Sequence, residues 1–269
     1  MTSRITLALF AALICCGGTN AQTVAWITTS TGGQGDVYAS LENNFETPGQ
    51  SVLAVDAQGN AFLGGAVRNG RNWDFLVVKF SSSGERLWTA SYGGAASTDD
   101  RALALAVDAS GNVLVTGYTG ANQSADVLTL KLNGDTGTRM WEASYQGVAG
   151  RADIGQQIAV TASGDVVVVG ESAGADGREV IVALKYAGST GVQIWQARDD
   201  GSPGNGQAVA ALTLTTDGSV VAAGITSTAT DLDFYSVCFS GADGARRWSQ
   251  TYAGSGSGFD RVYGVADDH

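Results

Sequence analysis

The chain repeats itself with a period of about 53 residues, and this repeat limits its possible folds more than any other feature. The turn glycines are spaced 52, 53 and 54 residues apart: Gly59, Gly111, Gly164 and Gly218. Tryptophans keep nearly the same period: Trp88, Trp141, Trp195 and Trp248, with Trp26 a further 62 residues upstream. All three lysines hold one repeat position: Lys79, Lys131 and Lys185. Three registers with one period indicate repeated supersecondary units that stack on one another.

Each copy of the repeat reads as four short strands. In the second copy the apolar runs are "ALALAV" (102–107), "VLVTGYT" (113–119), "DVLTLKL" (126–132) and "RMWEASY" (139–145). The segments "DASGN" and "NGDTGT" between them contain glycine, which accepts the positive φ of tight turns. No stretch keeps a helical period, and 38 glycines interrupt every candidate helix. The pattern predicts an all-β fold, a β-propeller of four-stranded antiparallel blades.

The residues of the repeat resemble a known family. The stretches "AVDASGNVLVTGY" and "DVLTLKLNGDTGTRMW" are similar to the SBBP repeat, a seven-bladed β-propeller repeat of bacterial secreted proteins. The shared features are the D-A-x-G-N turn, the T-G before the loop, the lysine-bearing strand and the late tryptophan. Complete copies cover 50–94, 101–147, 154–200 and 207–254. The resemblance implies a propeller that serves as a binding or structural module of a surface or secreted protein.

A more distant resemblance is to quinoprotein-type propellers. The stretches "LNGDTGTRMW" and "KYAGSTGVQIW" are similar to the D-x-x-T-G-x-x-x-W turn of that family. The chain lacks the closely spaced tryptophans by which quinoprotein blades dock. A quinoprotein-like propeller is therefore kept only as an alternative.

The first 21 residues have the features of a secretory signal peptide. Arg4 precedes an apolar run from Ile5 to Cys16, and small residues allow cleavage after Ala21. This run is too short to span a bilayer. We therefore predict export to the periplasm or the extracellular space. The mature propeller domain would cover 22–269 and keep one thiol, Cys238, so no intramolecular disulfide can form.

Both ends of that domain read as parts of a blade. The segment 22–30, "QTVAWITTS", has the pattern of a fourth strand, and 259–269, "FDRVYGVADDH", that of a first strand. Together they are two strands of one split blade that lacks its middle strands. We expect the chain to be a fragment of a longer propeller, and the alternative is an open arc of four blades with unpaired edges.

The charge of the chain argues against two kinds of partner. It has 26 acidic and 15 basic residues, a net charge of −11. Nucleic acids and anionic lipid surfaces attract clustered lysine and arginine. We therefore expect no nucleic-acid partner and no membrane insertion after signal cleavage. The expected ligand is a protein or a carbohydrate.

Residues that recur with the repeat are expected to be structural. The tryptophans should pack within or between blades, and the lysine stems should lie on an adjoining strand with the ammonium group at the blade edge. Asp56 with Lys79, and Asp108 with Lys131, should lie on the same face of the ring. We predict loose pairs worth under about 1 kcal/mol, because the second strand separates the partners. Cys238 replaces the lysine in the fourth copy and should be buried and inert.

Ligand-binding residues are expected where the repeat is broken. Trp73 belongs to no series and lies in the polar stretch "RNGRNWD", which reads as a loop. Asp100 and Asp153 lie on the connections between copies, eleven residues before a turn glycine. In a propeller these connections share one face with the loops between the second and third strands. We predict that a ligand meets this face at Trp73, Arg71, Asp100, Arg101 and Asp153.

The carboxylates also raise the question of a metal. A ring formed by Asp100, Asp153 and Asp260 at the channel rim should be solvated, or else bind calcium, which prefers oxygen ligands. The chain has no D-x-D-x-D-G loop, and no other cofactor is predicted. The only histidine is His269, the last residue, which argues against histidine-based catalysis or metal binding.

Two classes of function remain. The first is an exported, non-catalytic propeller that acts as a binding or structural module. The second is a carbohydrate-active propeller enzyme with paired carboxylates at the channel mouth. We favour the first class, because the carboxylates recur with the repeat whereas a catalytic pair should break it.

Overall fold

The structure is a computed structural model. It describes residues 37–38, then 52–254 except 71, 95–97, 121–123, 149, 200–205 and 229–230, and finally 260, 262 and 264–267. All regular structure in these residues is β-strand. The predicted signal peptide (1–21) and the predicted strand at 22–30 lie outside the described residues. The described residues of 259–269 form no strand, although the Asp260 backbone N donates to Leu232 O at 2.8 Å.

The strands form four sheets, which are the four predicted blades. Blade 1 contains β2 (Leu53–Val55), β3 (Ala61–Asn69), β4 (Asn72–Phe80) and β5 (Arg86–Tyr92), and β1 (Val37–Tyr38) also pairs with β3. Blade 2 contains β6 (Asp100–Val107), β7 (Val113–Thr119), β8 (Asp126–Leu132) and β9 (Arg139–Tyr145). Blade 3 contains β10 (Asp153–Val160), β11 (Val166–Ala173), β12 (Glu179–Tyr186) and β13 (Gln193–Arg198). Blade 4 contains β14 (Gly206–Leu214), β15 (Val220–Ser227), β16 (Leu232–Phe239) and β17 (Arg246–Tyr252).

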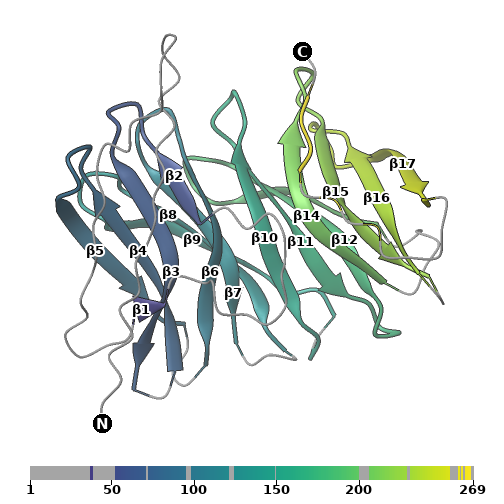
Figure 1. Cartoon of the computed structure of the whole chain (residues 1–269), viewed down its shortest axis with the longest axis horizontal. Helices are drawn as coiled ribbons and strands as arrows, with labels where there is room; N and C mark the ends of the chain where they lie inside the picture. Colours follow the sequence, from purple (N-terminus) through teal and green to yellow (C-terminus); the bar gives the residue numbers. More distant parts are fainter. Residues whose placement is uncertain are drawn as a thin grey trace.

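Within each blade, strands that are consecutive in the sequence pair antiparallel. The four sheets stand side by side in chain order, from blade 1 on the left of Figure 1 to blade 4 on the right. The strands predicted for the second copy are confirmed, and only β6 begins two residues earlier than expected. The all-β propeller prediction is therefore confirmed at the level of blades.

The first turn of every blade has one conformation. Gly59, Gly111, Gly164 and Gly218 have φ between 79° and 85°. In each turn the glycine N–H donates to the carbonyl three residues earlier, as Gly111 does to Asp108 at 2.9 Å. A side chain at this φ would be strained, which explains why glycine recurs here.

A second glycine recurs because the backbone of the neighbouring strand comes very close to it. The first strand of blades 2, 3 and 4 shifts register at the same place, for example between Ala102 and Ala104. This bulge pushes a carbonyl towards the neighbouring strand. A Cβ atom on Gly117 would lie 1.8 Å from Arg101 O, so no larger residue fits.

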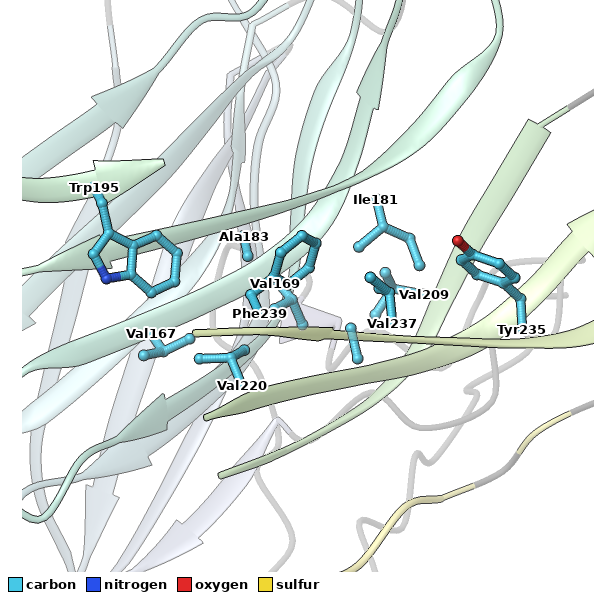
Figure 2. Close-up of a cluster of buried hydrophobic side chains, with 11 residues drawn as sticks. Val167, Val169, Ile181, Ala183, Trp195, Val209, Val220, Tyr235, Val237 and Phe239 are labelled. Atoms are coloured by element: carbon cyan, nitrogen blue, oxygen red, sulfur yellow. The ribbon is translucent and has the colours of Figure 1, made fainter. Parts of the chain in front are cut away.

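The hydrophobic core lies between the blades. In Figure 2, Val167, Val169, Ile181 and Trp195 of blade 3 face Val220, Tyr235, Val237 and Phe239 of blade 4. Similar clusters join blades 1 and 2 and blades 2 and 3. Each middle strand therefore buries both faces, which explains runs such as "VLVTG" and "VVVVG" that are apolar throughout.

Candidate ligand-binding site

The two ends of the blades differ in what they carry. One end, here called the turn face, bears the turns at 56–60, 108–112, 161–165 and 215–219 together with the turns between third and fourth strands. The opposite end, here called the link face, bears the hairpins between second and third strands and the links between blades. The repeated residues gather on the turn face, and the predicted site residues that the structure describes lie towards the link face.

On the turn face, blades 1, 2 and 3 each donate two side-chain hydrogen bonds to one carbonyl of the next blade. The tryptophan Nε1 atoms donate to this carbonyl at 2.9–3.1 Å: Trp88 to Gly134, Trp141 to Gly188 and Trp195 to Gly241. The lysine Nζ atoms donate to the same oxygens at 2.8–3.0 Å: Lys79 to Gly134, Lys131 to Gly188 and Lys185 to Gly241. The prediction that the tryptophans pack within or between blades is confirmed for these three, whereas Trp248 is 43% exposed and Trp26 lies outside the described residues.

The prediction of loose surface pairs is wrong. Lys131 Nζ lies 2.8 Å from Asp108 Oδ2, and both side chains are at most 10% exposed. Lys79 and Asp56 are buried as well, at 3.7 Å. The lysine stem crosses the second strand and the next blade then covers the pair. The ammonium group therefore lies inside a blade interface and not at a solvated edge.

The electrostatics of Asp108 reflect this environment. Burial raises the pKa of Asp108, but the hydrogen bonds from Lys131 and Asn112 outweigh it, and the pKa lies below its usual range. Asp108 also accepts the backbone N–H groups of Ser110 and Asn112, as an aspartate that caps its own turn does.

Blades 3 and 4 have other residues at the positions equivalent to Asp108 and Lys131. In blade 3, Thr161 stands in place of the aspartate, and Lys185 instead pairs with Asp165, four residues later, at 3.3 Å. In blade 4, Cys238 replaces the lysine, is 3% exposed and has a pKa raised by burial. The expectation of a buried thiol at Cys238 is confirmed.

On the link face, Trp73 lies within a strand and not in the loop that the sequence suggested. It is the second residue of β4 and pairs with Arg68 of β3 across a tight hairpin. Its backbone N–H donates to Asp99 Oδ1 at 3.1 Å, which ties the hairpin of blade 1 to the link before blade 2. This contact confirms that hairpins and links share one face. Arg71 lies outside the described residues.

Two guanidinium groups approach the Trp73 ring. Arg101 Cζ lies 5.5 Å from the ring centroid and Arg68 Cζ 5.9 Å from it, both within cation–π range. Arg101 Nε is buried and has no hydrogen-bond partner. Tyr118 is a further neighbour: burial raises the pKa of its hydroxyl, Arg101 lowers it and Asp99 raises it. The cluster of Trp73, Arg68 and Arg101 is called the Trp73 cluster below.

Asp100 and Asp153 are the first residues of β6 and β10, where the links enter blades 2 and 3. Asp100 is 1% and Asp153 0% exposed, so the expectation of a solvated rim is wrong. Each accepts a backbone N–H from the end of the preceding blade at 2.6 Å, from Gly94 and Gly147 respectively, and Asp260 accepts that of Gly254 at 2.8 Å. These carboxylates fix the angle at which the chain enters the next blade. The sequence prediction that they also contact a ligand stays a prediction.

The aspartates differ in their second oxygen. Asp153 accepts a hydrogen bond from the Ser172 hydroxyl, which is also a partner of Arg198, and this arrangement satisfies the buried carboxylate. In blade 2, Asp100 Oδ1 is buried without a partner. In the described part of the chain, no three His, Cys, Asp or Glu side chains gather closely enough to hold a metal ion. The sequence-based suggestion of calcium therefore finds no ligand set there.

Glu171 of β11 is an acidic residue that the sequence analysis overlooked. It is half-buried between blades 3 and 4, where its Oε1 accepts the backbone N–H of Val209 at 3.1 Å. Burial, and then the negative charge of Glu179, raise the pKa of Glu171 to about 8. Only a break in the repeat marks this position, because Ala66, Tyr118 and Ile225 occupy it in the other blades.

A pH dependence follows from Glu171. Its folded pKa of about 8 exceeds the ordinary value of 4.5, so the unfolded chain releases the proton first and stability falls as pH rises between these values. We expect wild type to lose on the order of 2 kcal/mol more than Glu171→Gln between about pH 5 and about pH 8. Urea unfolding at both pH values measures this, and equal losses would show that Glu171 is ionised in the fold.

Comparisons with known proteins support the fold. The chain matches a PL25 ulvan lyase, solved bound to -[GlcA(1-4)Rha3S]-, with a TM-score of 0.52 and 11% identity over 75% of this chain. It also matches BamB from Moraxella catarrhalis (TM-score 0.45, 17% identity, 85% of this chain and 68% of BamB). A third match is a quinohemoprotein alcohol dehydrogenase from Comamonas testosteroni (TM-score 0.45, 14% identity, 75% of this chain and 35% of that one).

The ulvan lyase is a β-propeller, in agreement with the four blades seen here. The chain spans 55% of the length of the ulvan lyase. No protein-family model matches the chain, and no curated protein matches it in sequence. The resemblance to the SBBP repeat therefore stays a prediction. Among the described residues there is no helix that is long and apolar enough to cross a membrane.

Proposed function

We propose that this chain is a non-catalytic propeller domain of an exported protein and binds a polysaccharide on its link face. One observation carries the proposal: the Trp73 cluster occurs once, whereas the scaffolding contacts recur. Counted from the lysine position, Trp73 corresponds to Ala125, Glu179 and Leu232 in the other blades. A large aromatic side chain is therefore not needed to build a blade. An aromatic ring with arginines on a variable face of a constant scaffold is typical of recognition sites.

The carboxylates favour binding over catalysis. A glycoside-cleaving pair needs two carboxyl groups that face a substrate. Asp100 and Asp153 are buried at the starts of two different blades and accept backbone N–H groups. Glu171 has the raised pKa of a general acid, but its carboxyl group accepts a hydrogen bond from the next blade at Val209. Export rests on the signal-peptide pattern of 1–21.

Replacing Trp73 by alanine is expected to weaken polysaccharide binding by about tenfold or more. The probe is a panel of immobilised neutral and acidic polysaccharides, and affinities are measured by biolayer interferometry. Trp248→Ala is the matched control, because that ring is also partly exposed but belongs to the repeat. Circular dichroism confirms that both variants fold.

Two results would contradict the proposal. The first is a failure of the wild-type chain to bind any polysaccharide of the panel. The second is binding that survives Trp73→Ala but is lost on changing Asn60 and Asn112, which lie in the turns of the opposite face.

A further inference from the structure

We infer that the polysaccharide bound at the Trp73 cluster is acidic, and that its carboxylate or sulfate groups pair with Arg68 and Arg101. This inference rests on the proposed function and adds the chemical class of the ligand. It is based on the position of the two arginines beside the Trp73 ring and on the hydrogen-bond and ion-pair partners that they have.

Some arginines of the described residues are held by a carboxylate: Arg139 by Glu142, Arg178 by Asp176, Arg246 by Asp199 and Arg247 by Asp217. Arg68 and Arg101 share the lack of such a pair with Arg86 and Arg151, and differ from those two in converging on the Trp73 ring. Among the described residues, no carboxylate lies within ion-pair distance of Arg68 or Arg101, although the chain carries a net charge of −11. The nearby Asp99 carboxylate accepts the backbone N–H of Trp73. Two cations therefore converge on one ring without a direct ion pair to a described residue.

Arg101 Nε is buried and has no acceptor, whereas buried donors in folded proteins are normally satisfied. Carboxylate and sulfate oxygens are the acceptors that match the planar fork of a guanidinium group, since they can take two parallel N–H donors. Nε itself is out of a ligand's reach, but the Arg101 side chain is only partly buried, so an acidic ligand would neutralise its charge through the other N–H groups of the guanidinium.

The Trp73 ring beside the arginines limits the kind of molecule that can carry the acid group. Both guanidinium groups lie within 6 Å of the Trp73 ring centroid, so the acid groups they bind must lie beside an apolar surface. A uronate or sulfated sugar carries its acid group on a rigid ring with apolar C–H faces. A glutamate or aspartate side chain carries it on a flexible stem and loses more conformational entropy on binding. The geometry therefore favours an acidic polysaccharide over an acidic peptide.

The experiment compares three immobilised polysaccharides: polygalacturonate for carboxylates, dextran sulfate for sulfates, and dextran as the neutral reference. We expect the wild-type chain to bind at least one acidic polymer and to leave dextran unbound. Arg68→Gln and Arg101→Gln should each weaken that binding by about tenfold, the scale of a charge-assisted contact. Added salt should weaken the binding of wild type more than that of the double variant.

Arg151→Gln is the matched control. Arg151 is exposed in the link between blades 2 and 3, and its removal changes the net charge by the same amount without touching the Trp73 cluster. We expect it to bind like wild type. Equal losses for Arg151→Gln and Arg101→Gln would overturn the inference, because only general electrostatic attraction would then be at work.

The remaining outcomes separate the inference from the proposed function. Binding to dextran that depends on Trp73 but not on either arginine would overturn the acidic class and leave the proposed function intact. Binding to polyglutamate alone, with loss in both arginine variants, would overturn the assignment to a polysaccharide and with it the proposed function. Loss of binding without loss of the folded state, measured by thermal unfolding of each variant, is required for support.

Discussion

Replacing Lys131 by methionine is expected to lower the free energy of unfolding by about 3–5 kcal/mol, the usual cost of breaking a buried ion pair. The change leaves the Asp108 carboxylate inside the interface between blades 2 and 3 without its cation. It also removes one of the two donors to Gly188 O, the other being Trp141. The pair stabilises the fold fully at neutral pH. This contribution disappears as pH falls through the lowered pKa of Asp108. Urea unfolding measures the loss.

Blade 4 supplies the matched control for this prediction. It carries Thr215 and Cys238 where blade 2 carries Asp108 and Lys131. The double variant Asp108→Thr, Lys131→Cys reproduces that pair and leaves no buried charge. We expect it to recover more than half of the loss, because a buried pair can be replaced as a whole far more cheaply than it can be broken. A loss under about 1 kcal/mol in Lys131→Met alone would restore the view of a loose surface contact.

Removing the Trp141 side chain is expected to cost about 3–5 kcal/mol, whereas the same change at Trp248 should cost less than about 1 kcal/mol. Both residues hold one repeat position, but Trp141 is 7% exposed and Trp248 is 43% exposed. Trp141 packs against Tyr186 and donates to Gly188 O of the next blade. Trp248 has no blade beside it in the described part of the chain. The contrast therefore measures what one blade contributes to the stability of its neighbour.

The measurement is urea unfolding of Trp141→Ala and Trp248→Ala. Far-UV circular dichroism monitors the transition, because the substitutions alter the tryptophan fluorescence. Trp141→Phe is a second control, since it keeps most of the apolar contact and loses the donor. We expect an intermediate loss for this variant. Equal losses at positions 141 and 248 would mean that tryptophan stabilises its own sheet and not the interface.

The blades were predictable from the sequence because their determinants are local. A glycine at a fixed place in a turn, such as Gly111, sets the conformation of four residues by itself. The strands of blade 2 follow from apolar runs bounded by those turns. The packing of Trp141 between blades was also predictable, because a large aromatic residue that recurs with the period must meet the same surroundings in each copy.

The missed features depend on distances between strands and between blades. The Lys131–Asp108 pair was misjudged because backbone spacing ignores the reach of a lysine stem and the cover given by the next blade. In blade 3 the acidic partner of the lysine is Asp165, which lies four residues after Thr161, the equivalent of Asp108. A search for residues that recur with the period cannot find a partner that has changed its place in the turn. The meeting of Arg101 with Trp73 depends on how blades 1 and 2 lie side by side, and nothing in the order of residues records this.

The exposed ring of Trp248 has a consequence for how the chain comes apart. In the part of the chain that the structure describes, each hydrophobic cluster joins two adjacent blades, so the free energy divides into nearest-neighbour terms, as in a one-dimensional array. Blade 4 packs on one side against blade 3, while its outer ring residues Trp248 and Tyr252 meet solvent. Fraying should therefore begin at β17, and amide hydrogens of blades 2 and 3 should exchange most slowly. Hydrogen exchange would then read out the order of the blades along the row.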